Sequence, residues 1–155
     1  MNPVAFFGRP AEDVAKDLLG MILVRNTGTG GAITGKILEV GAYEGGNQTA
    51  SREGMLYSPG SLFMMPFRGT YFLNVATDAK GTPSCVELRA VSVQGKSVKG
   101  SGAVANAFQI TPDLDVIVLG NEVEITGEPH PERVKRVKGS ADNCIGLYLF
   151  KQEYQ

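Results

Sequence analysis

The clearest strand signal in this sequence reads Gly35-Lys-Ile-Leu-Glu-Val-Gly-Ala-Tyr-Glu-Gly45. Because side chains alternate between the two faces of a strand, Glu39, Gly41 and Tyr43 share one face. A carboxylate beside an aromatic ring at a strand end suits a pocket where the carboxylate activates water and the ring stacks on a flat base. An exposed Glu39 on an edge strand and a half-buried Tyr43 explain the same pattern equally well.

Short elements surround this strand. Pro10 suits a first helical position and Gly20 a helix stop, so we expect a helix between them. A second helix is expected over residues 101–108, and strands over residues 21–25, 33–43, 62–65, 70–76, 84–93, 116–119, 122–126 and 144–150. The pattern predicts an α+β fold. We expect residues 1–155 to form a single domain with a curved, mainly antiparallel sheet or open barrel and short packed helices.

The cysteines and the hydropathy of the sequence indicate where the protein is located. The 155 residues include 20 glycines and two cysteines, Cys85 and Cys144, in apolar surroundings. We expect two reduced, buried thiols, with a single disulfide as the alternative. The sequence has no charged-then-apolar leader and no apolar run near about 18 residues, so it predicts neither secretion nor membrane spanning. The expected location is the cytoplasm, or the nucleoid or nucleus.

The charge balance is unusual for a protein that holds a polyanion. The formal net charge is −1, whereas nonspecific DNA affinity comes mainly from neutralised phosphates. A net charge near zero can still hide a local patch of positive charge that binds phosphates. One cluster is Arg133-Val-Lys-Arg-Val-Lys138, and Lys96 and Lys99 form another. For each cluster, a solvated charged face and a nucleic-acid contact stay open as interpretations.

Three segments taken in order, residues 35–45, 54–75 and 86–91, resemble the alkyladenine (3-methyladenine) DNA glycosylase family. The similarity extends diffusely from Phe6 to Phe150. It implies a monofunctional base-excision repair glycosylase that flips an alkylated or deaminated purine out of double-stranded DNA and hydrolyses the N-glycosidic bond. It also implies that no metal and no organic cofactor is needed. We expect a monomer that makes no membrane contact.

The resemblance assigns roles to residues of the first and third segments. The family's water-activating glutamate falls at Gly41, which has no acid or base chemistry, and Tyr43 matches the tyrosine that stacks on the flipped base. Glu39 and Glu44 are the two candidates to substitute as the catalytic carboxylate. Glu39 lies on the correct face but roughly 6.6 Å further along the strand, whereas Glu44 is nearer but should point to the opposite face unless the chain turns there. We therefore expect Gly41→Glu to raise activity. Arg89 matches an arginine close to the water and a phosphate, although an ion pair with Glu87 explains it equally well.

The second segment matches the family's base-binding hairpin. Met64 or Met65 takes the pocket position, and Phe67 or Arg68 takes the wedge that fills the stack after a base leaves. Asn74 matches an asparagine that helps to reject guanine by crowding its amino group. An apolar hairpin packed in the core is the alternative for residues 62–69. The family's base-contacting histidine has no counterpart between residues 44 and 52.

Two other functions compete with the glycosylase. A catalytically inactive lesion- or nucleic-acid-binding domain would agree with Gly41 and with the acidic balance. An RNA-binding barrel, similar to the appendages of tRNA formyltransferases, would share the fold. A glycosylase needs a carboxylate facing a base-sized cavity, whereas a binding domain needs only a basic groove, so the site geometry distinguishes them.

Overall fold

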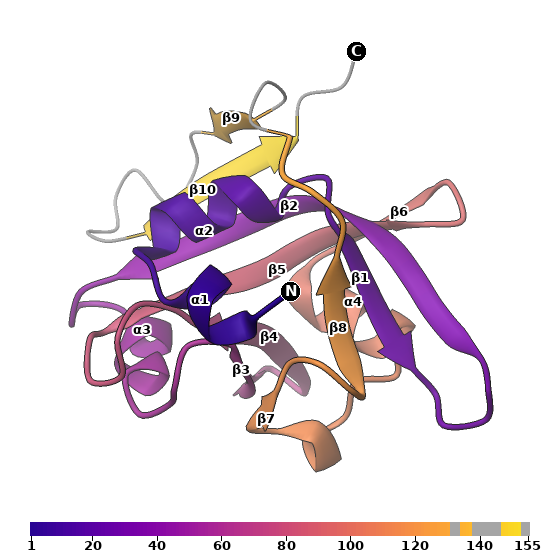
Figure 1. Ribbon diagram of the computed structural model, residues 1–155, viewed down its shortest axis with the longest axis horizontal. Coiled ribbons are helices and arrows are strands. Elements are labelled where there is room, and N and C mark those ends of the chain that lie inside the picture. Colours follow the sequence, from indigo (N-terminus) through magenta and orange to yellow (C-terminus); the bar gives the residue numbers. More distant parts are fainter. Residues whose placement is uncertain (131–133, 138–146, 153–155) are drawn as a thin grey trace.

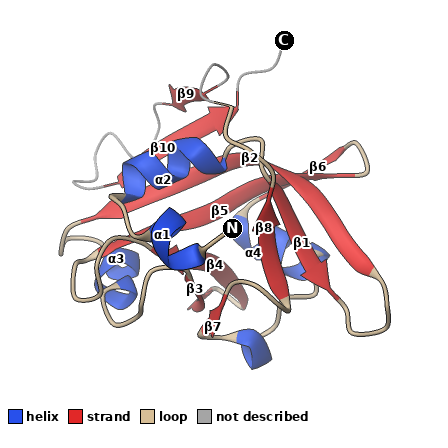
Figure 2. Cartoon of the chain, in the orientation of Figure 1, coloured by secondary structure: helices blue, strands red, loops and turns tan. Residues whose placement is uncertain are grey.

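The computed structural model describes residues 1–130, 134–137 and 147–152. Its strands are β1 (Ile22–Asn26), β2 (Ala32–Glu44), β3 (Ser61–Phe67), β4 (Thr70–Ala76), β5 (Ser84–Val93), β6 (Lys96–Lys99), β7 (Ile117–Val118), β8 (Val123–Thr126), β9 (Val134–Val137) and β10 (Leu147–Gln152). Its helices are α1 (Pro3–Phe7), α2 (Ala11–Leu18), α3 (Thr49–Gly54) and α4 (Ser101–Ala107), with a 3₁₀ turn η1 (Pro112–Leu114). Figure 2 shows these short helices around a curled sheet, and the predicted α+β fold is confirmed.

The sheet is organised by its longest strand, β2. Its strand order is β7-β3-β4-β5-β2-β1-β8, with β10 also pairing with β2 and β6 with β5. Every recorded strand pair is antiparallel. The first half of β2 pairs with β1 and its second half with β10, while β5 runs along its other edge. One long strand thereby curls the sheet into the half-barrel seen in Figure 1.

The two faces of β2 bury different clusters. Val40 and Ala42 belong to the main core, together with Val86 and Leu88 of β5. Helix α2 packs on these two strands (Figure 1). The alternating residues Gly41 and Tyr43 therefore point to the opposite face. That face carries a smaller cluster of Ala50, Phe63, Ala76 and Cys85, with Tyr43, Tyr57 and Met65 packed against it.

Several elements lie where the sequence predicts them. The α2 helix occupies residues 11–18 with Glu12 and Asp13 in its first turn, β5 has the expected bounds, and α4 ends one residue earlier than expected. Helices α1 and α3 and strand β6 were not predicted. The two helices have only five and six residues, too few to produce a helical repeat of apolar positions.

Some predictions fall partly outside the described residues. Cys85 is buried and makes no disulfide in the described structure, whereas Cys144 lies outside the described residues. The last strand begins at Leu147, so residues 144–146 of the expected strand also lie outside them. No helix in the described part of the chain is long and apolar enough to cross a membrane.

Candidate functional site

Three neighbouring strands bring Gly41, Glu87 and Asn74 into one row across the sheet. Gly41 on β2 is the register partner of Glu87 on β5, and Glu87 is also the partner of Asn74 on β4. Directly opposed residues of antiparallel strands project to the same face. This face is the one that carries Tyr43, two residues along β2, and Arg89, two residues along β5. The row therefore places a carboxylate beside the glycine.

The polar side chains around this row form one hydrogen-bonded cluster. The Tyr43 hydroxyl donates to Glu87 Oε1 at 3.2 Å, and Arg89 Nη1 donates to the same oxygen at 2.7 Å. Arg89 Nε donates to Glu39 Oε2 at 3.1 Å. The ion pair of Arg89 with Glu87 that the sequence left open is thus present, and Arg89 additionally connects Glu87 to Glu39.

Burial controls the electrostatics of this cluster. Only 3% of Glu87 is exposed, and burial raises the pKa of its carboxyl, although Arg89 and the Tyr43 hydrogen bond oppose the shift. Burial, followed by the charge of Glu87, raises the pKa of the Tyr43 hydroxyl well above its usual value. Tyr43 therefore stays a neutral donor, and Glu87 is a carboxylate whose proton affinity is enhanced.

The cluster opens into two adjoining pockets. The first, here called the aromatic pocket, has a volume of about 310 Å³. It is lined by Tyr43, Gln48, Thr49, Ala50, Met65, Pro66, Phe67, Phe72, Asn74 and Glu87. The second, here called the α4 pocket, has a volume of about 430 Å³ and is lined by Thr70, Phe72, Glu87, Arg89, Gly100, Ser101, Gly102, Ala103 and Asn106. Glu87 and Phe72 line both pockets, so the carboxylate lies where they meet.

The β3–β4 hairpin projects an aromatic side chain at the rim of the aromatic pocket. Its turn residues Arg68 and Gly69 both have positive φ, 49° and 80°, which allows a tight two-residue connection. Phe67 is 48% exposed, and its ring lies 5.0 Å from that of Phe72. The Arg68 guanidinium lies 5.1 Å from the Phe67 ring centroid. The alternative of a hairpin packed wholly in the core does not hold at this tip.

The predicted site residues divide between these features. Tyr43, Met65, Phe67 and Asn74 line the aromatic pocket, and Arg89 lines the α4 pocket. Glu39 lines neither pocket and is held by Arg89. Of the two methionines left open by the sequence, Met65 reaches the pocket.

Two further candidates lie away from the pockets. Met64 belongs to the main core. Glu44 accepts a hydrogen bond from the Glu12 backbone N–H at 3.1 Å, at the start of α2. This contact confirms that Glu44 points to the face opposite the row.

Sequence reasoning missed Glu87 and Phe72, the two residues that line both pockets. Both alternate correctly with known candidates, since Glu87 lies two residues before Arg89 and Phe72 two residues before Asn74. The alternation of residues along each strand therefore indicated that Glu87 and Phe72 face the site. Alternation does not give the register between β2 and β5, which has irregularities between Ile37 and Val40.

Of the two cationic clusters, only Lys96 and Lys99 lie among residues whose side chains are described, and they line neither pocket. Lys96 and Lys99 are exposed at the two ends of β6, which pairs with β5. Residues 134–137 form β9, whereas Arg133 and Lys138 lie outside the described residues. A nucleic-acid contact by either cluster stays a prediction.

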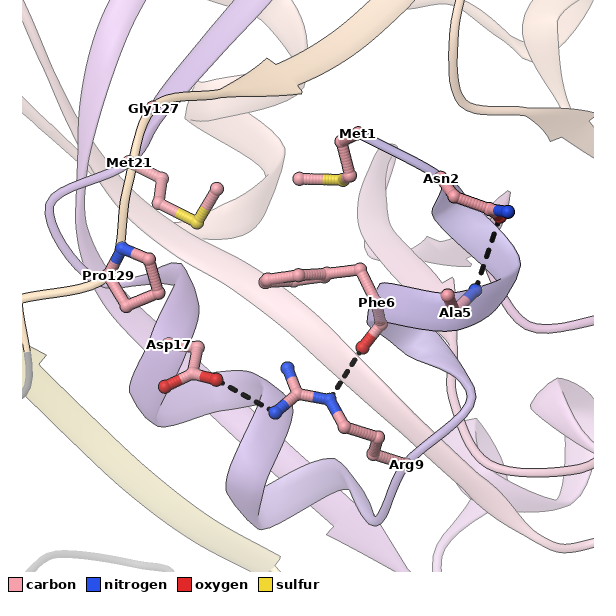
Figure 3. A pocket seen from close by; sticks show the side chains of 9 residues that line it. All are labelled: Met1, Asn2, Ala5, Phe6, Arg9, Asp17, Met21, Gly127 and Pro129. Carbon is pink, nitrogen blue, oxygen red and sulfur yellow. Dashed lines mark hydrogen bonds and ion pairs between the residues drawn. The ribbon is translucent and has the colours of Figure 1, made fainter.

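A third pocket lies beside the N-terminal helix and shares no lining residue with the other two. It has a volume of about 500 Å³. Figure 3 shows the Arg9 side chain between Phe6 and Asp17. Arg9 donates to the Phe6 carbonyl and to the Asp17 carboxylate, each at 2.8 Å. The two charged side chains that line this pocket, Arg9 and Asp17, are therefore paired with each other. Among the described residues, no group of three His, Cys, Asp or Glu side chains is placed to hold a metal ion.

Comparison with known proteins identifies relatives of this chain. The profile of the family described as Methylpurine-DNA glycosylase (MPG) matches residues 5–147. The DNA-3-methyladenine glycosylase of Mus musculus is 38% identical over 97 residues, which cover 56% of this chain and 28% of the mouse protein. A protein of Anaeromyxobacter sp. (strain Fw109-5), named "Putative 3-methyladenine DNA glycosylase", is 34% identical over 145 residues, covering 83% of this chain and 74% of the relative.

A relative from Methanocella arvoryzae with the same name as the Anaeromyxobacter protein is 30% identical over 162 residues, covering 88% of this chain and 78% of its own length. The chain spans less than a third of the mammalian relatives that it matches. The profile match nevertheless covers most of the chain, including all strands that build the two pockets. The chain belongs to the methylpurine-DNA glycosylase family.

Proposed function

We propose that this protein is a DNA N-glycosylase that removes damaged purines in base excision repair. The observation that carries the proposal is the meeting of an aromatic pocket and a buried carboxylate at Glu87. A pocket of about 310 Å³ lies at the small end of the range of about 300–1,000 Å³ typical of ligand sites. A flat base fits such a pocket, and a carboxylate at its edge can activate water for hydrolysis.

The lining residues suit a flipped base. In this proposal Tyr43 and Phe72 provide stacking surfaces, and Met65 supplies an adaptable apolar contact. Asn74 is 1% exposed, and among the described residues its amide donates a 3.4 Å hydrogen bond to the Phe72 carbonyl while its oxygen accepts a 4.0 Å hydrogen bond from the Cys85 thiol. A buried amide with such a long bond retains capacity to read a base edge. That capacity agrees with the expected role of Asn74 in rejecting guanine.

The hairpin tip suits a duplex with a gap in its stack. Phe67 would fill the space that the flipped base leaves, since apolar wedges stabilise such openings. Arg68, beside Phe67, would meet a phosphate of the backbone. Arg89 is 31% exposed at its side chain and would contribute a second phosphate contact from the α4 pocket. We also propose that the protein acts as a monomer in the compartment that holds the DNA.

A base-release assay tests this proposal. Excess protein is incubated with duplexes that carry hypoxanthine, ethenoadenine or 3-methyladenine, and with an undamaged duplex of the same sequence. For the hypoxanthine, ethenoadenine and undamaged duplexes, hot alkali then converts abasic sites into strand breaks. For the 3-methyladenine duplex, the released free base is measured by chromatography instead. Release from a damaged duplex alone is the expected result. Tight binding without release from any lesion would refute the glycosylase and favour the nucleic-acid-binding domain.

A further inference from the structure

We propose that Glu87 is the residue that accepts a proton from the attacking water, presented from β5 rather than from β2. This inference rests on the proposed glycosylase activity and names the group that performs its hydrolytic step. It transfers the water-activating role, which the family resemblance puts at Gly41, to the residue directly opposite on the neighbouring strand.

The two oxygens of Glu87 have different surroundings. Oε1 accepts hydrogen bonds from the Tyr43 hydroxyl at 3.2 Å and from Arg89 Nη1 at 2.7 Å. Within the described part of the chain, no hydrogen bond is made to Oε2. One oxygen is thus anchored by two donors, and the other is left to accept from a water molecule. A carboxylate that is fixed in this way needs little reorganisation when it takes up a proton.

The position of Glu87 also fits the role. It is the one carboxylate among the described residues that lines the aromatic pocket, and it lines the α4 pocket as well. Opposed residues of antiparallel strands have Cβ atoms about 4.5–5.5 Å apart. Glu39, two residues from Gly41 along β2, is roughly 6.6 Å away. Glu87 therefore reaches the expected place of the catalytic carboxylate more closely than Glu39 does.

The other carboxylates near the row line neither pocket. Glu39 accepts from Arg89 Nε at 3.1 Å and lines neither pocket. Glu44 lies on the opposite face, where it accepts from the Glu12 backbone N–H. Because Gly41 has no side chain, the position opposite Glu87 on β2 contributes no side-chain group to the site. Gly41 and Glu87 thus form a complementary pair, in which one strand lacks the carboxylate that the other supplies.

The step balances without any further reagent. Glu87 Oε2 takes one proton from water, and the water oxygen forms a bond to C1′ of the deoxyribose. The bond between C1′ and the purine nitrogen breaks, and its electron pair leaves with the base. In an N-alkylated purine such as 3-methyladenine, this pair neutralises the positive charge of the ring, so the base leaves without receiving a proton. Glu87 then releases its proton to solvent. Burial, which raises the pKa of this carboxyl, makes it a stronger base.

Matched substitutions of three glutamates test the assignment. The wild-type protein and its Glu87→Gln, Glu39→Gln and Glu44→Gln variants are compared in single-turnover base release from duplex DNA methylated with dimethyl sulfate. Melting temperature and affinity for the same duplex are measured in parallel. The Glu87→Gln variant should lose roughly 10²–10⁴-fold in rate while it keeps its fold and binds the duplex. Glu44→Gln is the control for loss of one charge from the same strand region and should stay within about threefold of wild type.

The possible results separate the two proposals. If wild-type protein releases no base from the methylated duplex or from the hypoxanthine and ethenoadenine duplexes, the proposed function fails. If wild type is active and Glu87→Gln retains its rate within about threefold, the glycosylase stands and the role of Glu87 is overturned. A large loss in Glu39→Gln alone would also overturn it in favour of Glu39.

A pH profile distinguishes proton transfer from a structural contribution. A general base works when it is deprotonated, so the wild-type rate should rise with pH and level off above the pKa of Glu87. The residual rate of Glu87→Gln should lack this rise. A variant profile with the same inflection as wild type would assign the titration to another group and refute the proposal.

Discussion

Replacing Phe67 by alanine examines how the protein holds damaged DNA. Phe67 is 48% exposed and contacts the Phe72 ring. A fully buried Phe→Ala change costs about 3–5 kcal/mol of stability, so a half-buried ring should cost about 2 kcal/mol. The exposed half of the ring amounts to about 100 Å² of the roughly 200 Å² that a phenylalanine can bury. At about 25 cal/mol per Å², its insertion into DNA contributes up to about 2.5 kcal/mol, or roughly 60-fold in affinity.

The assay compares the affinity for a hypoxanthine duplex with the affinity for an undamaged duplex of the same sequence. The Phe67→Ala variant should bind the damaged duplex up to roughly 60-fold more weakly than wild type, and the undamaged duplex only a few-fold more weakly. The difference arises because only the damaged duplex opens readily enough to accept the ring. Tyr71→Ala is a matched control. Tyr71 is 38% exposed on the same hairpin but lines neither pocket.

Three results would refute this reasoning. An equal loss of affinity for both duplexes would show that Phe67 does not enter the stack. A loss of stability of about 3–5 kcal/mol would mean that the ring belongs to the core. An equal effect of Tyr71→Ala would assign the loss to the hairpin surface in general. Melting temperatures of all variants, measured beside the affinities, provide the comparison.

Three further predictions concern the row at Gly41. Gly41→Glu alone should lower activity in single-turnover assays, because the new carboxylate would repel Glu87, whereas the same change in a Glu87→Gln background should restore activity at least tenfold. This expectation replaces the sequence-based one, in which Gly41→Glu raises activity. The folded protein holds the Glu87 proton more tightly than the unfolded chain does. Well below pH 4.5, the unfolding free energy of wild type should therefore equal that of Glu87→Gln. As pH rises toward the raised pKa of Glu87, wild type should become less stable than the variant. A difference in unfolding free energy that stays constant with pH in denaturant titrations would contradict this. Cationic 3-methyladenine should be released faster than neutral hypoxanthine in paired assays, because its departure needs no donated proton, and a faster release of hypoxanthine would contradict the mechanism.

Local sequence was enough to predict much of this protein. Alternation along residues 35–45 and 84–93 predicted the two strands that form the floor of the site, and it placed Tyr43 on one face and Glu44 on the other. These features depend on the period of a strand, which any single segment reveals. The order of the three segments also indicated the family.

The tertiary structure decided which groups meet. Met64 and Met65 look equivalent in the sequence, but the pairing of β3 with β4 puts Met64 beside Leu73 in the main core and Met65 beside Phe72 in the pocket. The pairing of Gly41 with Glu87 depends on a register between strands more than 40 residues apart, with irregularities that local patterns do not contain. A shift of one residue would have turned Glu87 to the opposite face. The carboxylate opposite Gly41 was therefore visible only after folding, because long-range pairing rather than local alternation brings it there.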